Sequence, residues 1–193
     1  MSRPPVLRVD LPAWLAGFRS KLPPRLPDIE QRMEVAISLA RQNVIAGSGG
    51  PFGALVVSAA DGEVIALGVN RVEPASCSSA HAEIVALSLA QQGSGHWNLA
   101  EHRAAPLQLV TSCEPCAMCL GAIPWSGVGS VLCGATKADA EAAGFDEGDR
   151  PDAWVDKLKA RGIAVSLAVK RSEAAAVLDM YARGGHTIYG PGQ

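Results

Sequence analysis

The chain has 193 residues, enough for one domain with a buried core. Apolar residues make up 48% of it and charged residues 19%, a balance that excludes a disordered chain. The formal net charge is −2 and no cluster of Lys and Arg residues stands out, which disfavours a nucleic-acid-binding surface and favours a small-molecule substrate.

The cysteines and the apolar stretches bear on the cellular location. Three of the five cysteines fall within seven positions, which is more typical of reduced thiols than of a disulfide scaffold. Proline and aspartate interrupt the N-terminal apolar stretches before the core of a signal peptide could form, and no apolar run reaches the length of a membrane span. We therefore expect a cytoplasmic protein.

The first segment, residues 1–27, holds six of the thirteen prolines and is predicted to form an arm. One short helix is expected within it, at residues 11–18. Residues 28–193 are predicted to form a single domain that ends in a C-terminal tail. The first helix of this domain begins after Asp28, a suitable N-cap, and its apolar residues recur at helical spacing up to Gly47.

Strands and helices alternate through the rest of the chain. Two strands, 54–58 and 63–69, are joined through Asp61-Gly62, which favours a hairpin turn. The later elements are, in order, a helix at 79–89, a strand at 107–111, a helix from Pro115 to Gly127, a strand at 128–133, a helix at 137–143, a strand at 163–169 and a helix at 172–182. This order predicts an α/β fold with a five-stranded mixed sheet in a three-layer α/β/α arrangement, largely parallel apart from its first hairpin.

Two short motifs carry the chemistry: His81-Ala82-Glu83 and Pro115-Cys116-Ala117-Met118-Cys119. Each is predicted to lie where a helix begins. Cys116 and Cys119 are three residues apart and share a helix face, and a helix N-terminus favours their thiolate forms. With His81 they offer three ligands to one Zn²⁺ per chain, which leaves one tetrahedral position open for water, as in catalytic zinc sites. Glu83 is then free to hold that water and carry its proton.

Simpler interpretations exist for each motif alone. A Cys-x-x-Cys pair can be a redox pair or half of a structural zinc site, with Cys113 or Cys77 as a further ligand. A His-x-Glu triplet alone arises easily by chance. Their combination favours a catalytic zinc site, and the unliganded Glu83 argues against a non-catalytic, zinc-stabilised binding module. Met118 is expected to belong to the core.

Five segments resemble a known family: residues 49–54, 68–70, 81–83, 111–119 and 144–146. The chain resembles the zinc deaminases of the cytidine deaminase-like fold, and within them it is most similar to the bacterial guanine deaminases. The resemblance covers about residue 30 to the tail and leaves the arm unmatched. It implies hydrolytic deamination of guanine to xanthine and ammonia, a step of purine catabolism, with Glu83 as a catalytic residue.

The acidic pair Asp146 and Glu147 follows the expected fourth strand and bears on the choice of base. Guanine presents N–H groups beside a carbonyl, so a pocket that selects it should place a carboxylate against the N–H groups. We expect Glu147, or else Asp146, to take this role, and we count Glu147 among the catalytic residues. The alternative for both is an exposed acidic turn.

Other residues are expected to contact the substrate. Asn70 has an amide that can donate to the guanine carbonyl, and Phe52 can lie against the flat purine. Trp125 is expected to flank the pocket, although it and Phe52 could equally be core residues. Ala82, inside the first motif, and Tyr189, in the tail, complete the expected substrate contacts.

Related deaminases define the alternatives. Enzymes that act on tRNA adenosine, on cytosine or cytidine, or on an aminotriazine such as ammeline share the fold. The net charge and the pI of about 6.1 disfavour tRNA, and free cytidine deaminases usually carry a third cysteine at the position of His81. The resemblance also implies a homodimer, in which the C-terminal segment crosses to the partner and closes its active site.

Overall fold

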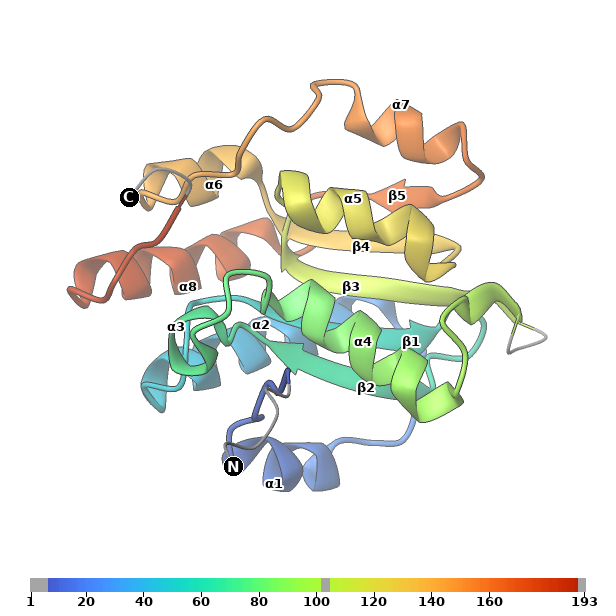
Figure 1. Ribbon diagram of the computed structural model, residues 1–193, viewed down its shortest axis with the longest axis horizontal. Helices are drawn as coiled ribbons and strands as arrows, with labels where there is room; N and C mark the ends of the chain where they lie inside the picture. Colours follow the sequence, from blue (N-terminus) through green and yellow to red (C-terminus); the bar gives the residue numbers. More distant parts are fainter. Residues whose placement is uncertain (1–6, 102–104, 191–193) are drawn as a thin grey trace, which may run out of the picture.

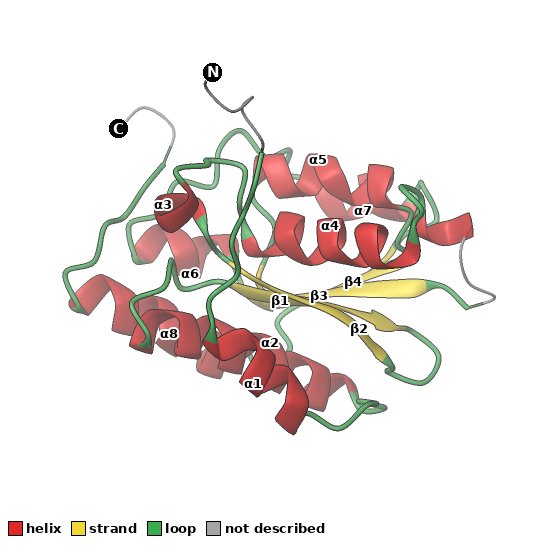
Figure 2. Cartoon of the chain, turned by 60° about the horizontal axis from the view of Figure 1, so that its bottom comes forward, coloured by secondary structure: helices red, strands yellow, loops and turns green. Residues whose placement is uncertain are grey.

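The computed structural model describes residues 7–101 and 105–190. Its helices are α1 (Trp14–Lys21), α2 (Ile29–Ile45), α3 (Val72–Ala75), α4 (Ala82–Ser94), the 3₁₀ turn η1 (Leu99–Glu101), α5 (Ala117–Ser126), α6 (Lys137–Ala142), α7 (Trp154–Lys159) and α8 (Arg171–Arg183). Its strands are β1 (Gly53–Ser58), β2 (Val64–Val69), β3 (Leu107–Cys113), β4 (Ser130–Ala135) and β5 (Ala164–Ser166). Helices cover both faces of the sheet (Figure 1 and Figure 2).

The sheet is mixed, with the strand order β2-β1-β3-β4-β5. Strand β1 is antiparallel to both β2 and β3, and β4 is parallel to both β3 and β5. The predicted α/β fold with a five-stranded mixed sheet is confirmed. Strands β2, β3, β4 and β5 all point the same way, as expected, and β1 alone is reversed. Because α4 carries the chain from β2 past β1, the antiparallel part includes the pairing of β1 with β3 as well as the first hairpin.

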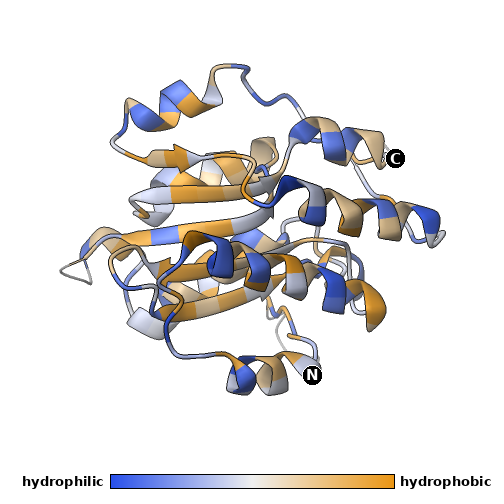
Figure 3. Ribbon diagram, turned by 180° about the vertical axis from the view of Figure 1, so that it is seen from behind, coloured by the Kyte–Doolittle hydropathy of each residue, from blue (hydrophilic) through white to orange (hydrophobic). Residues whose placement is uncertain are grey.

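Each strand contributes side chains to two separate cores. Leu55 and Val57 of β1 pack with α2 and α8, whereas Ala54 and Val56 pack with α4, α5 and α7. Successive side chains of a strand point to opposite faces, so burial on both faces requires continuous apolar strands. Figure 3 shows the consequence, with hydrophobic strands inside and helices that alternate hydrophobic and hydrophilic residues.

The starts of two helices differ from prediction in a way that matters for the site. Helix α4 begins at Ala82 with His81 as its N-cap, and α5 begins at Ala117 with Cys116 as its N-cap. Pro115 therefore precedes α5 and does not open it. One metal-binding candidate thus occupies the extended N-cap position of each helix, where backbone N–H groups of the first turn remain free.

Three other elements were missed or mis-sized. The short helices α3 and α7 were not predicted, and neither has a side-chain hydrogen bond at its N-cap. Strand β5 has three residues instead of the seven expected, and Ala168 just after it has a φ of 59°. Among the described residues, no helix combines the length and apolar character needed to cross a membrane.

Part of the predicted N-terminal arm packs against the body of the molecule. Leu15 of α1 is buried, and the chain then runs antiparallel to the edge of β2 through an Arg25–Glu63 bridge. The Leu26 N–H donates to the Gly62 carbonyl at 2.9 Å. The arm therefore covers an edge that would otherwise present unpaired backbone groups. Its residues 1–6 lie outside the described part of the chain, and the division at residue 27 stays a prediction.

Gly68 of β2 allows α4 to lie close to the sheet. A Cβ atom there would be 2.3 Å from the Ala82 carbonyl oxygen and 2.6 Å from the Ala86 nitrogen. Gly68→Ala should therefore force α4 away and lower the free energy of unfolding by about 1–3 kcal/mol, the usual cost of overpacking. Urea denaturation measures this.

Gly93→Ala is the matched control, because Gly93 belongs to α4, the helix that packs against Gly68. Nothing lies within 4 Å of a Cβ at Gly93, so the alanine should stabilise the protein by up to about 1 kcal/mol. If Gly68→Ala were as stable as the wild type, the close contact between β2 and α4 would not be a constraint.

Candidate active site

The three predicted metal ligands converge at the N-terminal ends of α4 and α5, which run side by side on one face of the sheet (Figure 1). The His81 Nδ1 lies 3.5 Å from the Sγ of Cys116 and 3.5 Å from the Sγ of Cys119. Two ligands of one tetrahedral zinc, with bonds of about 2.0 Å to nitrogen and about 2.3 Å to sulfur, would also be about 3.5 Å apart. The three residues therefore fit a zinc ion.

The charge of the two sulfurs also fits a cation. Hydrogen bonds from the Cys119 thiol and from His81 lower the pKa of the Cys116 thiol to about 4. The hydrogen bond from the Cys119 thiol to Cys116, together with burial, raises the pKa of Cys119. A zinc ion would displace any proton from the two sulfurs and bind both as thiolates.

Glu83 lies in the first turn of α4 and is only 6% exposed. It lines the cavity next to the ligands but is not part of the group of three ligand atoms, which lie within 4.8 Å of one another. Burial raises the pKa of Glu83. A buried carboxyl beside a metal site, and not bound to it, can accept a proton and give it back.

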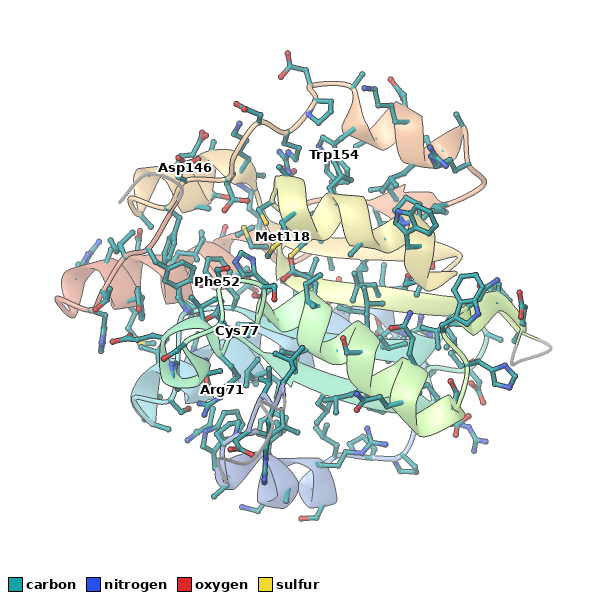
Figure 4. The ribbon with its side chains drawn as sticks, in the orientation of Figure 1. Phe52, Arg71, Cys77, Met118, Asp146 and Trp154 are labelled. Carbon is teal, nitrogen blue, oxygen red and sulfur yellow. The ribbon has the colours of Figure 1, made fainter. Side chains whose placement is uncertain are left out.

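A cavity of about 500 Å³ opens above this group. His81, Glu83 and Cys116 line it from the helix ends, and Phe52 lines it from the loop before β1. This volume is within the range of small-molecule sites. Figure 4 labels Phe52, Met118 and Asp146, which lie around the place where α4, α5 and the loop after α6 meet.

The acidic pair divides between two environments. Glu147 is 5% exposed, lines the cavity, and its Oε2 has no hydrogen-bond partner among the described residues. Burial, with the nearby charges of Cys116 and Glu83, raises the pKa of Glu147 to about 8. Asp146 is exposed, and its Oδ1 accepts a hydrogen bond of 2.7 Å from the Gly148 N–H. Of the two, only Glu147 therefore has a buried carboxyl oxygen at the cavity without a hydrogen-bond partner among the described residues.

Asn70 lies behind Tyr189 as seen from the cavity. Its Oδ1 accepts hydrogen bonds from the N–H groups of Gly50, at 3.3 Å, and Val72, at 3.2 Å, and its Nδ2 donates to the Tyr189 hydroxyl. Tyr189 lines the cavity, whereas Asn70 is not among the lining residues. The tail thus lines the cavity of its own chain. The Asn70 amide, which was expected to donate to the substrate, donates to the Tyr189 hydroxyl instead.

Two predicted contacts do not reach the cavity. Trp125 is 77% exposed and lies nine residues after Cys116, about 14 Å along α5, so the expectation that it flanks the pocket is wrong. Ala82 is completely buried against the sheet, and its side chain does not line the cavity. Met118, in contrast, is 39% exposed and lines the cavity, so the expectation of a core residue is wrong.

The lining and supporting residues that were not predicted include Phe145, Glu114 and Arg150. Phe145 packs edge-to-face on Phe52, with ring centroids 4.9 Å apart, and both line the cavity. Glu114 lines the cavity and forms a buried ion pair with Arg150. Phe145 lies within a segment that carried the family resemblance, and Glu114 directly precedes the cysteine motif, so the sequence contained a signal for these two but none for Arg150.

A three-ligand zinc site, a buried carboxyl beside it and a small cavity above it define a zinc-dependent deaminase. The comparisons with known proteins agree. Residues 27–135, more than half of the chain, match the family model of the cytidine and deoxycytidylate deaminase zinc-binding region. The chain belongs to this family.

Its relatives include guanine deaminases. The guanine deaminase of Bacillus subtilis is 43% identical over 118 residues, which are 61% of this chain and 71% of the relative. The structure of a guanine deaminase from Nitrosomonas europaea is 45% identical, with a TM-score of 0.87, over 92% of this chain and 97% of that one. A mutant protein in complex with 8-azaguanine is 46% identical, with a TM-score of 0.87, over 92% of this chain and 98% of that one.

Cys116→Ala should abolish stoichiometric zinc binding, because it removes a thiolate ligand from a three-ligand site. Metal analysis of the purified protein measures this, with one zinc per chain expected in the wild type. Cys77→Ala is the control, since Cys77 is partly exposed and outside the ligand group, and it should keep its zinc. A Cys116→Ala protein with full zinc would overturn the ligand assignment.

Proposed function

We propose that this protein catalyses the hydrolytic deamination of guanine to xanthine and ammonia. The observation that carries the proposal is the Glu147 carboxyl, which is buried at the cavity with an oxygen that has no hydrogen-bond partner among the described residues. Buried polar groups are normally paired, so the missing partner is expected to come from a ligand. The relatives named guanine deaminase, and the related complex with 8-azaguanine, support the same choice.

Guanine supplies the donors that Glu147 lacks. Its N1–H and its exocyclic amine lie side by side on one edge, so a carboxylate can accept from both. Adenine presents an acceptor at N1 and would leave the buried carboxyl unpaired, which sites of this kind reject strongly. The aromatic faces of Phe52 and Phe145 offer apolar surface to the purine ring.

Glu83 is proposed as the proton carrier. When bound, zinc supplies a Lewis acid that makes water a better nucleophile at neutral pH. Glu83 accepts one proton from the attacking water at a carboxylate oxygen and gives it to a ring nitrogen as the C2–O bond forms. It then takes the second proton from the new hydroxyl and gives it to the exocyclic amine. The bond from C2 to that amine breaks, so water supplies the oxygen and the amine leaves as ammonia. The buried position of Glu83 keeps competing solvent away from these transfers.

Further aspects of the function are also proposals. We expect a cytoplasmic homodimer that works in purine catabolism and accepts aminotriazines such as ammeline as side substrates. We do not expect tRNA as a partner, because the net charge is −2. Exchange of the tail between subunits also stays a proposal; within one chain, Tyr189 of the tail lines the cavity.

Glu83→Gln should keep its zinc and its fold but lose at least about 10²–10⁴-fold in turnover, the usual contribution of a placed proton carrier. The amide has the shape of the carboxyl but cannot accept the proton. Ammonia release from guanine measures the loss, and metal analysis with thermal melting provides the controls. Turnover close to that of the wild type would exclude Glu83 as the proton carrier.

Glu147→Gln should depress the kcat/KM for guanine strongly and leave zinc content and melting temperature almost unchanged. The amide can accept only one of the two N–H groups, and its own N–H₂ then opposes the other. The same assay on adenine, cytosine, ammeline and a tRNA stem-loop checks the substrate. A wild type that prefers the tRNA stem-loop would contradict the guanine assignment and leave only the family membership.

A further inference from the structure

A buried ion pair lies directly beside the cavity. The Arg150 Nη2 is 2.7 Å from the Glu114 Oε2, and the two side chains are only 7% and 9% exposed. It is the most buried of the ion pairs between described residues. Surface pairs contribute little to stability, but a buried pair that loses one partner leaves an uncompensated charge. The proposed chemistry of zinc, Glu83 and Glu147 does not use this pair.

Glu114 is fixed independently of Arg150. It directly follows β3, and its N–H donates to the Ala135 carbonyl of β4 at 2.8 Å. Its Oε2 also accepts a hydrogen bond of 3.2 Å from the Lys137 N–H, at the start of α6. Glu114 is two residues before Cys116, so it forms a rigid anchor immediately before the metal-binding turn.

Arg150 is held on three sides. Besides the ion pair, its Nη1 donates to the Pro115 carbonyl at 3.1 Å, and its guanidinium lies 4.9 Å from the centroid of the Trp154 ring. Trp154 is 5% exposed and belongs to the core cluster on this face (Figure 4). A planar guanidinium can make these two hydrogen bonds and stack at the same time, whereas a lysine ammonium cannot.

The chain between Glu147 and Arg150 is a tight turn against α5. The Ala117 N–H donates to the Glu147 carbonyl at 2.9 Å, and the Arg150 N–H donates to the Gly148 carbonyl at 2.8 Å. Gly148 has a φ of +68°, and a Cβ there would lie 3.2 Å from the Ala117 Cβ. The Arg150 side chain thus holds the far end of the short turn whose near end presents the Glu147 carboxyl.

We propose that Arg150, locked to Glu114 and Pro115, is a positioning residue that sets the Glu147 carboxyl against the N–H edge of the base. This inference rests on the proposed function, in which Glu147 accepts those N–H groups. The Glu147 Oε2 has no partner of its own among the described residues, so its position in the cavity depends on the turn that carries it. The pair thereby ties base recognition to the segment that carries two of the metal ligands.

A double-mutant cycle between Arg150 and Glu147 tests the proposal on the zinc-loaded enzyme. Arg150→Met should lower the kcat/KM for guanine by about 10–100-fold, mostly through KM, with zinc content unchanged. In a Glu147→Gln background the same substitution should cost little more, because the carboxyl that Arg150 positions is already lost. Arg150→Lys keeps the positive charge but cannot make both hydrogen bonds of the guanidinium, so its kcat/KM should stay as low as that of Arg150→Met.

Arg171→Met is the matched control. Arg171 forms a two-pronged pair with Asp139, at 2.8 and 2.9 Å, that joins α8 to α6 and is more exposed than the Arg150 pair. Its loss should leave both KM and kcat unchanged. If Arg150→Met does not fold, Arg150→Gln and Glu114→Gln, which keep hydrogen-bonding atoms, take its place in the same cycle.

Two results would overturn the proposal. Equal losses from Arg150→Met with and without Glu147 would mean that Arg150 does not act through that carboxyl, and full rescue by Arg150→Lys would mean that charge alone matters. Failure of the proposed function gives a different result, namely a wild type that deaminates another base. The same double-mutant cycle is then measured with that base as substrate, and a smaller loss from Arg150→Met in the Glu147→Gln background again shows that Arg150 acts through Glu147.

Discussion

The convergence of three ligand atoms from two helices constrains the whole molecule. The atoms of His81, Cys116 and Cys119 lie within 4.8 Å of one another, so α4 and α5 must begin almost in contact. The strands fix both starts. Gly68 lets β2 lie against the first turn of α4, and the hydrogen bond from Glu114 to Ala135 ties the segment before α5 to β4. A shift in the position of β2 or β4 would move the start of one helix away from the other and separate the ligand atoms. The geometry of the site therefore depends on the register of the sheet.

Charge is the second constraint, because the cavity gathers acidic groups. The Cys116 thiol and the carboxyls of Glu83 and Glu147 line the same cavity, with Cys119 beside them, and burial together with the charges of Cys116 and Glu83 raises the pKa of Glu147. A divalent cation offsets two thiolates, so the metal also makes it less costly to keep two carboxylates nearby. The guanidinium of Arg150 lies nearby, and its ion pair with Glu114 holds it in place. Positive charge on the metal and on Arg150 thus offsets the negative charge that gathers at the cavity.

Local sequence predicted part of this arrangement and could not predict the rest. The metal ligands and Glu83 could be assigned because the spacing within each motif, one at the start of α4 and one at the start of α5, determines the local geometry. Trp125 was misplaced although the predicted helix up to Gly127 already put it nine residues beyond Cys116, at the far end of α5. The Arg150–Glu114 pair joins residues 36 positions apart, and no periodicity records such a contact. The orientation of β3 was equally hidden, because it depends on the path of the connection and not on the strand residues.

The family match covers the metal site but only part of the cavity lining. It spans residues 27–135, which include every metal ligand and Glu83, whereas Glu147 and Tyr189 lie beyond it. The arm also acts on the cavity wall from outside the match. The Trp14 Nε1 donates to the Ser48 Oγ at 3.0 Å, and that hydroxyl donates at 2.7 Å to Asn43.

The Asn43 Nδ2 donates at 2.9 Å to the carbonyl of Asn70, whose side chain donates to Tyr189. Both flanks of the chain therefore meet at Asn70. The family match thus covers the metal site, and segments from both sides of that match meet at the wall of the cavity above it.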